Sequence, residues 1–234
     1  MVVPAYDEAG RVGATVEAAQ HLPLVDLVVV VDDGSADATA DVARAAGAVV
    51  GGHRRRRGKA AAMETGADLV AQADRDDGRP SSRLLLFLDA DLGSSAAHAS
   101  PLATPVLGGQ ADMTIALLPP GARPGGGHGF VVELARRGIE SRTGWRPTQP
   151  LSGQRCVTRA AFEALRPLAR GFGVETALTV DALRQGLRVV EVEVALSHRV
   201  TGRDWRSQLH RVRQYGDVAL ALAARRRGQG RGQG

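Results

Sequence analysis

Short, uninterrupted apolar runs alternate with helical patterns through the first half of the chain. A strand covered on both faces of a sheet reads as such a run, because neither of its faces meets water. The predicted strands lie at residues 2–3, 27–31, 48–50, 84–88 and 113–118, with a later one at 189–194. This alternation of strand and helix is typical of βαβ units. The pattern therefore predicts an α/β fold with a mainly parallel central sheet flanked by helices.

Helix boundary signals support the same interpretation. Ser35 is a plausible N-cap for a helix that reaches Ala46, and Gly47 fits the left-handed residue that follows a helix. Two further helices are predicted, an alanine-rich one that begins at Lys59 and one over residues 175–185.

Composition excludes several classes of protein. The chain has 234 residues, 44% of them hydrophobic and 24% charged, which is ordinary for a globular domain. Its single cysteine, Cys156, excludes a disulfide framework and a cysteine-based zinc site. We find neither a signal peptide nor an apolar run of about 20 residues, so we expect a cytoplasmic protein.

The positive charge is concentrated at the C-terminus. The net charge is +5, and Arg225, Arg226, Arg227 and Arg231 supply four of those charges, which leaves +1 for the rest. Residues 225–234 are predicted to be a disordered basic tail, which leaves open a peripheral contact with anionic lipid. A nucleic-acid-binding domain would carry its arginines on a folded face, so no nucleic-acid partner is expected.

Polar clusters follow three of the predicted strands. They are Pro4-Ala5-Tyr6-Asp7-Glu8, Asp32-Asp33-Gly34-Ser35 and Asp89-Ala90-Asp91. Because the carboxyl ends of parallel strands meet at one edge of the sheet, these clusters are expected to converge there. Two carboxylates separated by one residue can face the same Mg²⁺ or Mn²⁺ ion. The alternative is that both aspartates are solvated loop residues with a capping role.

Other nucleotide-binding motifs do not match. A P-loop needs Ser or Thr after its Gly-Lys pair, but Gly58-Lys59 is followed by Ala60, and His53 stands where its first glycine belongs. No dinucleotide fingerprint follows any predicted strand. Phosphatases with an Asp-x-Asp motif want Thr or Val two residues after the second aspartate, where this chain has Gly93.

The ordered set of Val3–Glu8, Val31–Ser35, Gly58-Lys59 and Asp89–Asp91 resembles family 2 glycosyltransferases of the GT-A fold. Further segments are similar to the dolichyl-phosphate mannose synthase-like branch of that family: Gly125-Gly126-Gly127 with Arg136-Arg137, Ser152-Gly153-Gln154-Arg155, and Gly171-Phe172-Gly173-Val174-Glu175. The resemblance implies a GT-A-like, Rossmann-type sandwich over residues 1–224, with a donor half at 1–118 and an acceptor half at 119–224.

The resemblance also implies roles for individual residues. The expected nucleotide-sugar contacts are Pro4, Ala5, Tyr6, Glu8, Asp32, Asp33, Lys59, Asp89 and Ala90. Asp91 would bind a Mg²⁺ or Mn²⁺ ion directly, Asp89 would reach the ribose or the ion through water, and His198 resembles a third metal ligand. The implied catalytic residues are Asp91, Glu175 and Arg199, the last as a clamp for a diphosphate or an acceptor phosphate.

The implied activity is transfer of a sugar from a UDP- or GDP-sugar to an acceptor, either a polyprenyl phosphate or a small phosphorylated molecule. Glu175 is followed by Thr176, where many inverting relatives have a Glu-Asp pair that contains the general base. Two alternatives stay open: a sugar-phosphate nucleotidyltransferase and a nucleotide-sugar-binding protein without turnover. The nucleotide base, the sugar, the acceptor, the stereochemistry and the oligomeric state are not determined by these residues.

Overall fold

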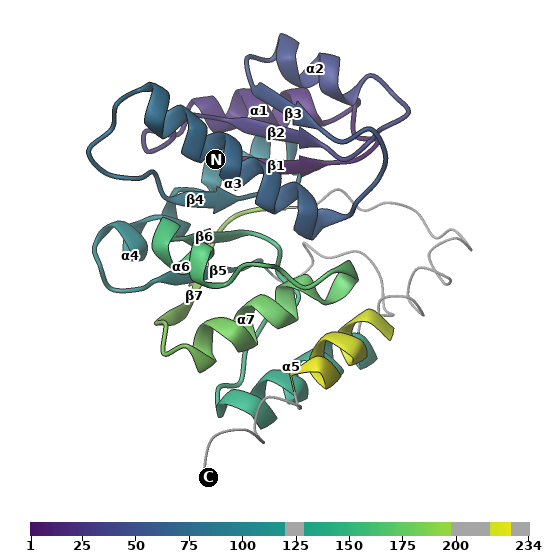
Figure 1. Cartoon of the computed structure of the whole chain (residues 1–234), viewed down its shortest axis with the longest axis vertical. Helices are drawn as coiled ribbons and strands as arrows, with labels where there is room; N and C mark the ends of the chain where they lie inside the picture. Colours follow the sequence, from purple (N-terminus) through teal and green to yellow (C-terminus); the bar gives the residue numbers. More distant parts are fainter. Residues whose placement is uncertain (120–128, 198–215, 226–234) are drawn as a thin grey trace.

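A computed structural model describes residues 1–119, 129–197 and 216–225 (Figure 1). Its centre is a seven-stranded sheet in the order β3-β2-β1-β4-β6-β5-β7. The strands are β1 (Val2–Ala5), β2 (Val29–Asp32), β3 (Val49–Gly52), β4 (Leu85–Phe87), β5 (Met113–Leu117), β6 (Arg155–Val157) and β7 (Val189–Glu193). All neighbouring pairs are parallel except those of β6, which runs antiparallel to β4 and β5. The predicted, mainly parallel α/β sheet is therefore confirmed.

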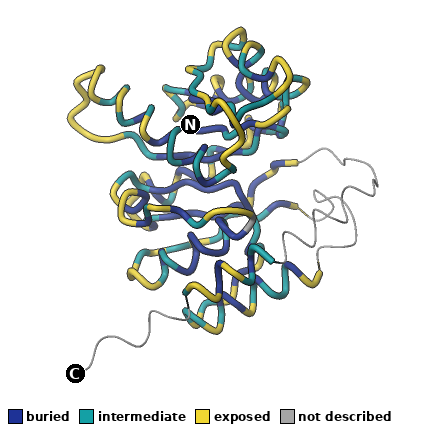
Figure 2. The backbone as a smooth tube through the Cα atoms, turned by 45° about the vertical axis from the view of Figure 1, so that its right-hand side comes forward, coloured by how far each residue is buried: buried dark blue, intermediate teal, exposed yellow. Residues whose placement is uncertain are grey.

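Helices cover both faces of this sheet. They are α1 (Val12–Gln20), α2 (Thr39–Ala45), α3 (Lys59–Asp76), α4 (Thr104–Leu107), α5 (Gly129–Thr143), α6 (Arg159–Ala164) and α7 (Val174–Arg184). Neighbouring residues of a strand face opposite ways, so Val3 packs in the cluster with α1 and Val2 in the cluster with α3, α6 and α7. Figure 2 shows the central strands as buried segments and the helices with exposed outer sides, whereas the edge strands β3 and β7 are only partly buried.

A third apolar cluster lies outside the sheet. Val131 and Ile139 of α5 and Val180 of α7 pack against Val218 and Leu222, which belong to helical residues 216–224. Figure 1 shows that last helical stretch alongside α5. Within the described ranges, no helix has the length and apolar character needed to cross a membrane.

Two local predictions need correction. The helix predicted from Ser35 begins only at Thr39, because the Ser35 hydroxyl is taken up by the Asp7 backbone N–H and by the Asp32 carboxylate. Arg225, predicted to lie in a disordered tail, is described and forms an ion pair with Asp181 of α7. Gly47 does follow the helix with a φ of 89°, as predicted. The rest of the predicted tail, residues 226–234, lies outside the described part of the chain.

Candidate active site

The three polar clusters lie at the same edge of the sheet, as their positions after parallel strands require. The loop after β1 is tied to the loop after β2, since the backbone N–H of Glu8 donates to Thr39 Oγ1 at 2.8 Å and that of Ala36 donates to Asp7 Oδ1 at 2.8 Å. Tyr6 is 37% exposed at this edge, and the Arg56 guanidinium stacks 4.1 Å from the centre of its ring.

Asp33 holds the loop that leads into α3. Asp33 is 4% exposed. Its carboxylate accepts hydrogen bonds from the backbone N–H groups of Arg57 at 2.8 Å and Gly58 at 2.7 Å, and lies 2.7 Å from His53 Nδ1. The loop also passes very close to Gly34, where an added Cβ would lie 2.7 Å from the Arg55 carbonyl carbon. Asp33, which we predicted to contact the donor, therefore also holds the loop before α3 in place.

The Asp89-Ala90-Asp91 turn follows β4 and is held in place by α1. Thr15, which is fully buried, donates to the carbonyl of Ala90 at 2.8 Å and accepts from the backbone N–H of Gly93 at 2.8 Å. Sequence reasoning missed Thr15, because this contact joins residues 75 positions apart and no local pattern indicates it.

Lys59 connects the first carboxylate of that turn to α7. Its ammonium lies 2.7 Å from Asp89 Oδ1 and 3.1 Å from Glu175 Oε1. Burial acts to lower the pKa of Lys59, but the charges and hydrogen bonds of the two carboxylates outweigh it and raise the pKa above its ordinary value. Lys59 is also the only lysine in the sequence. The structure thus brings together three of the predicted site residues, Lys59, Asp89 and Glu175.

The antiparallel strand β6 completes this cluster. Phe87 is opposite Arg155 in the ladder, which places Gly153, before β6, opposite Asp89. The side-chain amide of Gln154 donates to Asp89 Oδ2 at 2.6 Å. A Cβ at Gly153 would lie only 2.3 Å from Lys59 Nζ, so a glycine leaves room for the ammonium. Sequence reasoning noted this segment only for its resemblance to family members, and assigned Gln154 no role.

The carboxylates at this edge have the oxygen ligands that a divalent cation prefers. Burial raises the pKa of Glu8; Arg11 opposes this, while the negative charges of Asp91, Asp37 and Asp89 raise it further. That excess of negative charge on carboxylate oxygens is the donor chemistry that Mg²⁺ and Mn²⁺ prefer. The described residues contain no group of three His, Cys, Asp or Glu side chains able to hold a metal. His198, the predicted third ligand, and Arg199 lie outside the described residues.

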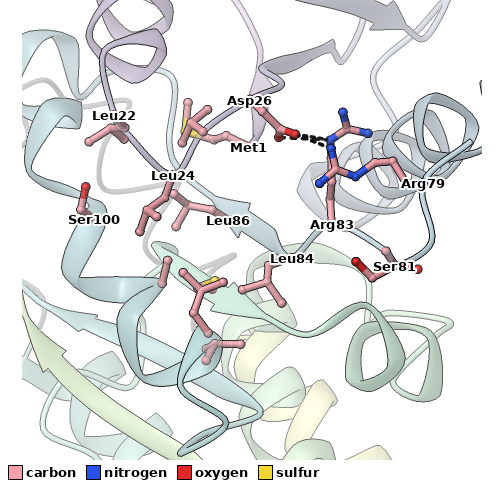
Figure 3. A pocket seen from close by; sticks show the side chains of 16 residues that line it. Met1, Leu22, Leu24, Asp26, Arg79, Ser81, Arg83, Leu84, Leu86 and Ser100 are labelled. Atoms are coloured by element: carbon pink, nitrogen blue, oxygen red, sulfur yellow. Dashed lines mark hydrogen bonds and ion pairs between the residues drawn. The ribbon is translucent and has the colours of Figure 1, made fainter. Parts of the chain in front are cut away.

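A separate pocket opens at the opposite edge of the sheet, beside the amino ends of β1 and β4 (Figure 3). It has a volume of about 350 Å³ and is lined mainly by apolar side chains, among them Leu22, Leu84 and Leu86. Its acidic group, Asp26, pairs with Arg79 and Arg83. The pocket therefore lacks the paired carboxylates of the first site, which is the better candidate for chemistry.

The chain is similar to known glycosyltransferases along most of its length. The family model described as Glycosyl transferase family 2 matches residues 1–124. A glucosyl-3-phosphoglycerate synthase from Mycolicibacterium paratuberculosis is 32% identical over 217 residues, which cover 81% of this chain and 61% of that relative. The chain thus spans less than two thirds of the length of this curated relative.

Solved structures share the fold. Crystal structures of glucosyl-3-phosphoglycerate synthase from Mycobacterium tuberculosis, one with phosphoglyceric acid and one with Mn²⁺, uridine diphosphate and phosphoglyceric acid, both superpose with a TM-score of 0.73 at 26% identity. The matches cover 96% of this chain and 78% and 76% of those chains. A structure described only as a mycobacterial protein superposes with a TM-score of 0.74 at 29% identity. That match covers 96% of this chain and 73% of the other chain.

These comparisons correct one expectation and confirm another. The expected likeness to the dolichyl-phosphate mannose synthase-like branch is wrong, because the similar proteins are glucosyl-3-phosphoglycerate synthases. The expected GT-A fold is confirmed by the superpositions. Since the family model matches more than half of the 234 residues, the chain belongs to glycosyltransferase family 2.

Proposed function

We propose that this chain transfers glucose from UDP-glucose to a small phosphorylated acceptor of the phosphoglycerate type, with Mn²⁺ or Mg²⁺. The observation that carries the proposal is the Asp89-Ala90-Asp91 turn, fixed by Lys59 and Gln154 at the carboxyl edge of the sheet. Support for the substrates comes from similar structures, whose descriptions name Mn²⁺, uridine diphosphate, UDP-glucose and phosphoglyceric acid.

Within this proposal, the residues at the carboxyl edge of the sheet have different roles. Asp91 would bind the divalent ion, and Asp89 would reach the ribose or the ion through water. When bound, such an ion neutralises the charge that develops on the departing diphosphate. The remaining proposed donor contacts are Pro4, Ala5, Tyr6, Glu8, Asp32, Asp33, Lys59 and Ala90.

Glu175 would lie beside the transferred sugar. Glu175 lies in the first turn of α7. Its side chain is 14% exposed and faces the Lys59 ammonium. A carboxylate held in this way is fixed in position, so it can orient a sugar hydroxyl without reorganising. His198 and Arg199 stay proposals of the same kind, as a metal ligand and as a phosphate clamp.

The two halves of the chain would then serve different substrates. We propose that residues 1–118 bind the donor and that residues 119–224 supply the acceptor contacts. In support, the first half provides the turns after β1, β2 and β4, whereas Gln154 and Glu175 approach the same cluster from the second half.

A ligand-binding panel tests the donor part of the proposal. UDP, GDP, dTDP and CDP are added to the protein with and without Mn²⁺, and the shift in melting temperature is measured. A ligand at 100 times its Kd should stabilise the native state by about 2.7 kcal/mol. We expect a metal-dependent shift with UDP; no shift with any of the four nucleotides would contradict the proposal.

A turnover assay then tests the acceptor. UDP release from UDP-glucose is measured with 3-phosphoglycerate, glycerol 3-phosphate or a polyprenyl phosphate, and we expect 3-phosphoglycerate to give the highest rate. Preference for the polyprenyl phosphate would replace the acceptor class. Pyrophosphate release from UTP and glucose 1-phosphate would instead favour a nucleotidyltransferase, and UDP binding without turnover a non-catalytic protein.

A further inference from the structure

Arg155 is a buried cation in the middle of the sheet. It lies in β6, its relative exposure is 1%, and among the described residues no carboxylate forms an ion pair with it. Burial lowers the pKa of Arg155 to about 10, while the more distant charges of Glu175 and Glu191 act to raise it. Burying a guanidinium without a carboxylate partner is unfavourable, so this residue needs an explanation beyond packing.

The guanidinium joins two segments of the second half of the chain. Its Nε donates to the carbonyl of Ser152 at 3.0 Å, and its Nη1 donates to Thr179 Oγ1 at 2.9 Å. The Thr179 hydroxyl in turn donates to the carbonyl of Glu175 at 2.9 Å. Within the described part of the chain, Nη2 has no hydrogen-bond partner. Arg155 therefore spans from the loop before β6 to the first turn of α7.

Each segment carries a side chain that contacts Lys59 or its partner Asp89. Two residues beyond Ser152, the Gln154 amide donates to Asp89 Oδ2 at 2.6 Å. Glu175 places its carboxylate 3.1 Å from Lys59 Nζ. A planar guanidinium has rigidly spaced donors, which suits a link between two fixed acceptors.

We infer that Arg155 and Thr179 are positioning residues that hold Gln154 and Glu175 against Asp89 and Lys59. The kinetic part of this inference rests on the proposed function, whereas the geometric part does not. Both side chains are too buried to contact a substrate, since Thr179 is fully buried and Arg155 nearly so. Their effect passes through the side chains that they hold.

The test uses two threonines of the same helix. Thr179→Val removes the hydroxyl that links Arg155 to Glu175 but keeps the shape of the side chain. Thr176→Val is the matched control, because Thr176 is equally buried and its hydroxyl has no partner among the described residues. A displaced reacting group can lower turnover by about 100-fold. We expect Thr179→Val to lower kcat at least tenfold with the Kd for UDP and Mn²⁺ unchanged, Thr176→Val to have no effect, and Thr179→Ser to restore activity.

A second readout does not depend on turnover. Because Lys59 is the only lysine, a protein labelled with ¹³C at lysine Cε gives one Cε signal by NMR, and that signal reports the cluster directly. We expect Thr179→Val to shift or broaden the Lys59 signal and Thr176→Val to leave it in place. Arg155→Gln should shift it too, because the shorter glutamine side chain cannot span both acceptors, and this variant adds no second lysine. If Arg155→Gln fails to fold, the threonine pair still decides.

The outcomes separate this inference from the proposed function. A Lys59 signal that is unchanged in Thr179→Val overturns the inference, whatever the turnover. A shifted signal in a protein that shows no turnover with any donor supports the positioning role and contradicts the proposed function. Normal kcat in Thr179→Val, with an active wild type, overturns the kinetic part.

Discussion

Lys59, the first residue of α3, donates a 2.7 Å hydrogen bond to Asp89, which lies two residues beyond the end of β4. The same ammonium lies 3.1 Å from Glu175, so one cation holds a residue of each half of the chain. Its pKa is raised by these carboxylates, which keeps it charged at neutral pH. The contact links the proposed donor site to the second half of the chain.

Removing this charge should impair turnover more than folding. In Lys59→Gln, Asp89 and Glu175 lose their shared cation, and we expect kcat/KM to fall by about 100-fold, as for the loss of one preorganised electrostatic group. Steady-state UDP release measures the effect. Arg75→Gln removes a cation from the other end of α3 and should leave kcat/KM within about twofold. Equal losses in both variants would show that only net charge matters.

Asp91 should be required for the metal-dependent part of donor binding. In Asp91→Asn, we expect the Mn²⁺-dependent stabilisation by UDP to disappear, because an amide is a much weaker ligand than a carboxylate for a hard cation. The melting temperature without ligand should change by no more than about 2 °C. Asp41→Asn, an exposed position on α2, is the control and should keep the full UDP shift. Retention of that shift in Asp91→Asn would exclude Asp91 as the principal metal ligand.

The ion-pair network around Arg83 should make stability depend on acidic pH. Burial acts to raise the pKa of Asp26, but the hydrogen bond and charge of Arg83 outweigh it, so the pKa is lowered overall. A carboxylate with a lowered pKa stabilises the fold above its unfolded pKa of about 3.9, and this contribution is lost as pH falls through the lower folded value. We therefore expect the free energy of unfolding in urea to fall below about pH 4, and less steeply in Asp26→Asn than in the wild type. Identical slopes would mean that Asp26 has the same pKa in both states.

Gly66, the glycine in α3, should tolerate no side chain. A Cβ there would lie 2.3 Å from Val2 Cγ1, and Val2 is fully buried in β1. Overpacking of this kind costs about 1–3 kcal/mol, against a gain of up to about 1 kcal/mol in helix propensity. We expect urea unfolding to show a net loss for Gly66→Ala, and recovery when Val2→Ala is added. Gly10→Ala, with nothing within 4 Å, should change stability by less than about 0.5 kcal/mol.

Sequence patterns were sufficient for the strands that are apolar throughout. Residues 27–31, 84–88 and 113–118 were predicted, and β2, β4 and β5 lie within two residues of those bounds. A run of this kind identifies a strand buried on both faces, whatever its neighbours are. The ends are less well defined, because they depend on turns that the run itself does not contain.

The missed elements share a physical cause. Strand β6 begins with Arg155, and a charged residue inside a three-residue strand gives no apolar run to detect. Ser35 has the residue type of an N-cap, yet its hydroxyl is held by Asp7 and Asp32 across two loops. Gln154 meets Asp89 only because β6 runs antiparallel. In each case a long-range contact determines the local structure, and a sequence window does not contain it.

The presence of one lysine among 30 basic residues has a practical consequence for anyone handling the protein. Reagents that couple to side-chain amines have one target, and it lies in the proposed catalytic cluster with 28% of its side chain exposed. Only a neutral amine reacts with such reagents, and the raised pKa keeps Lys59 protonated, so we expect its biotinylation to be slow while the cluster is intact. The rate of this modification therefore reports the cluster, because losing either carboxylate partner would lower the pKa of Lys59 and speed its reaction.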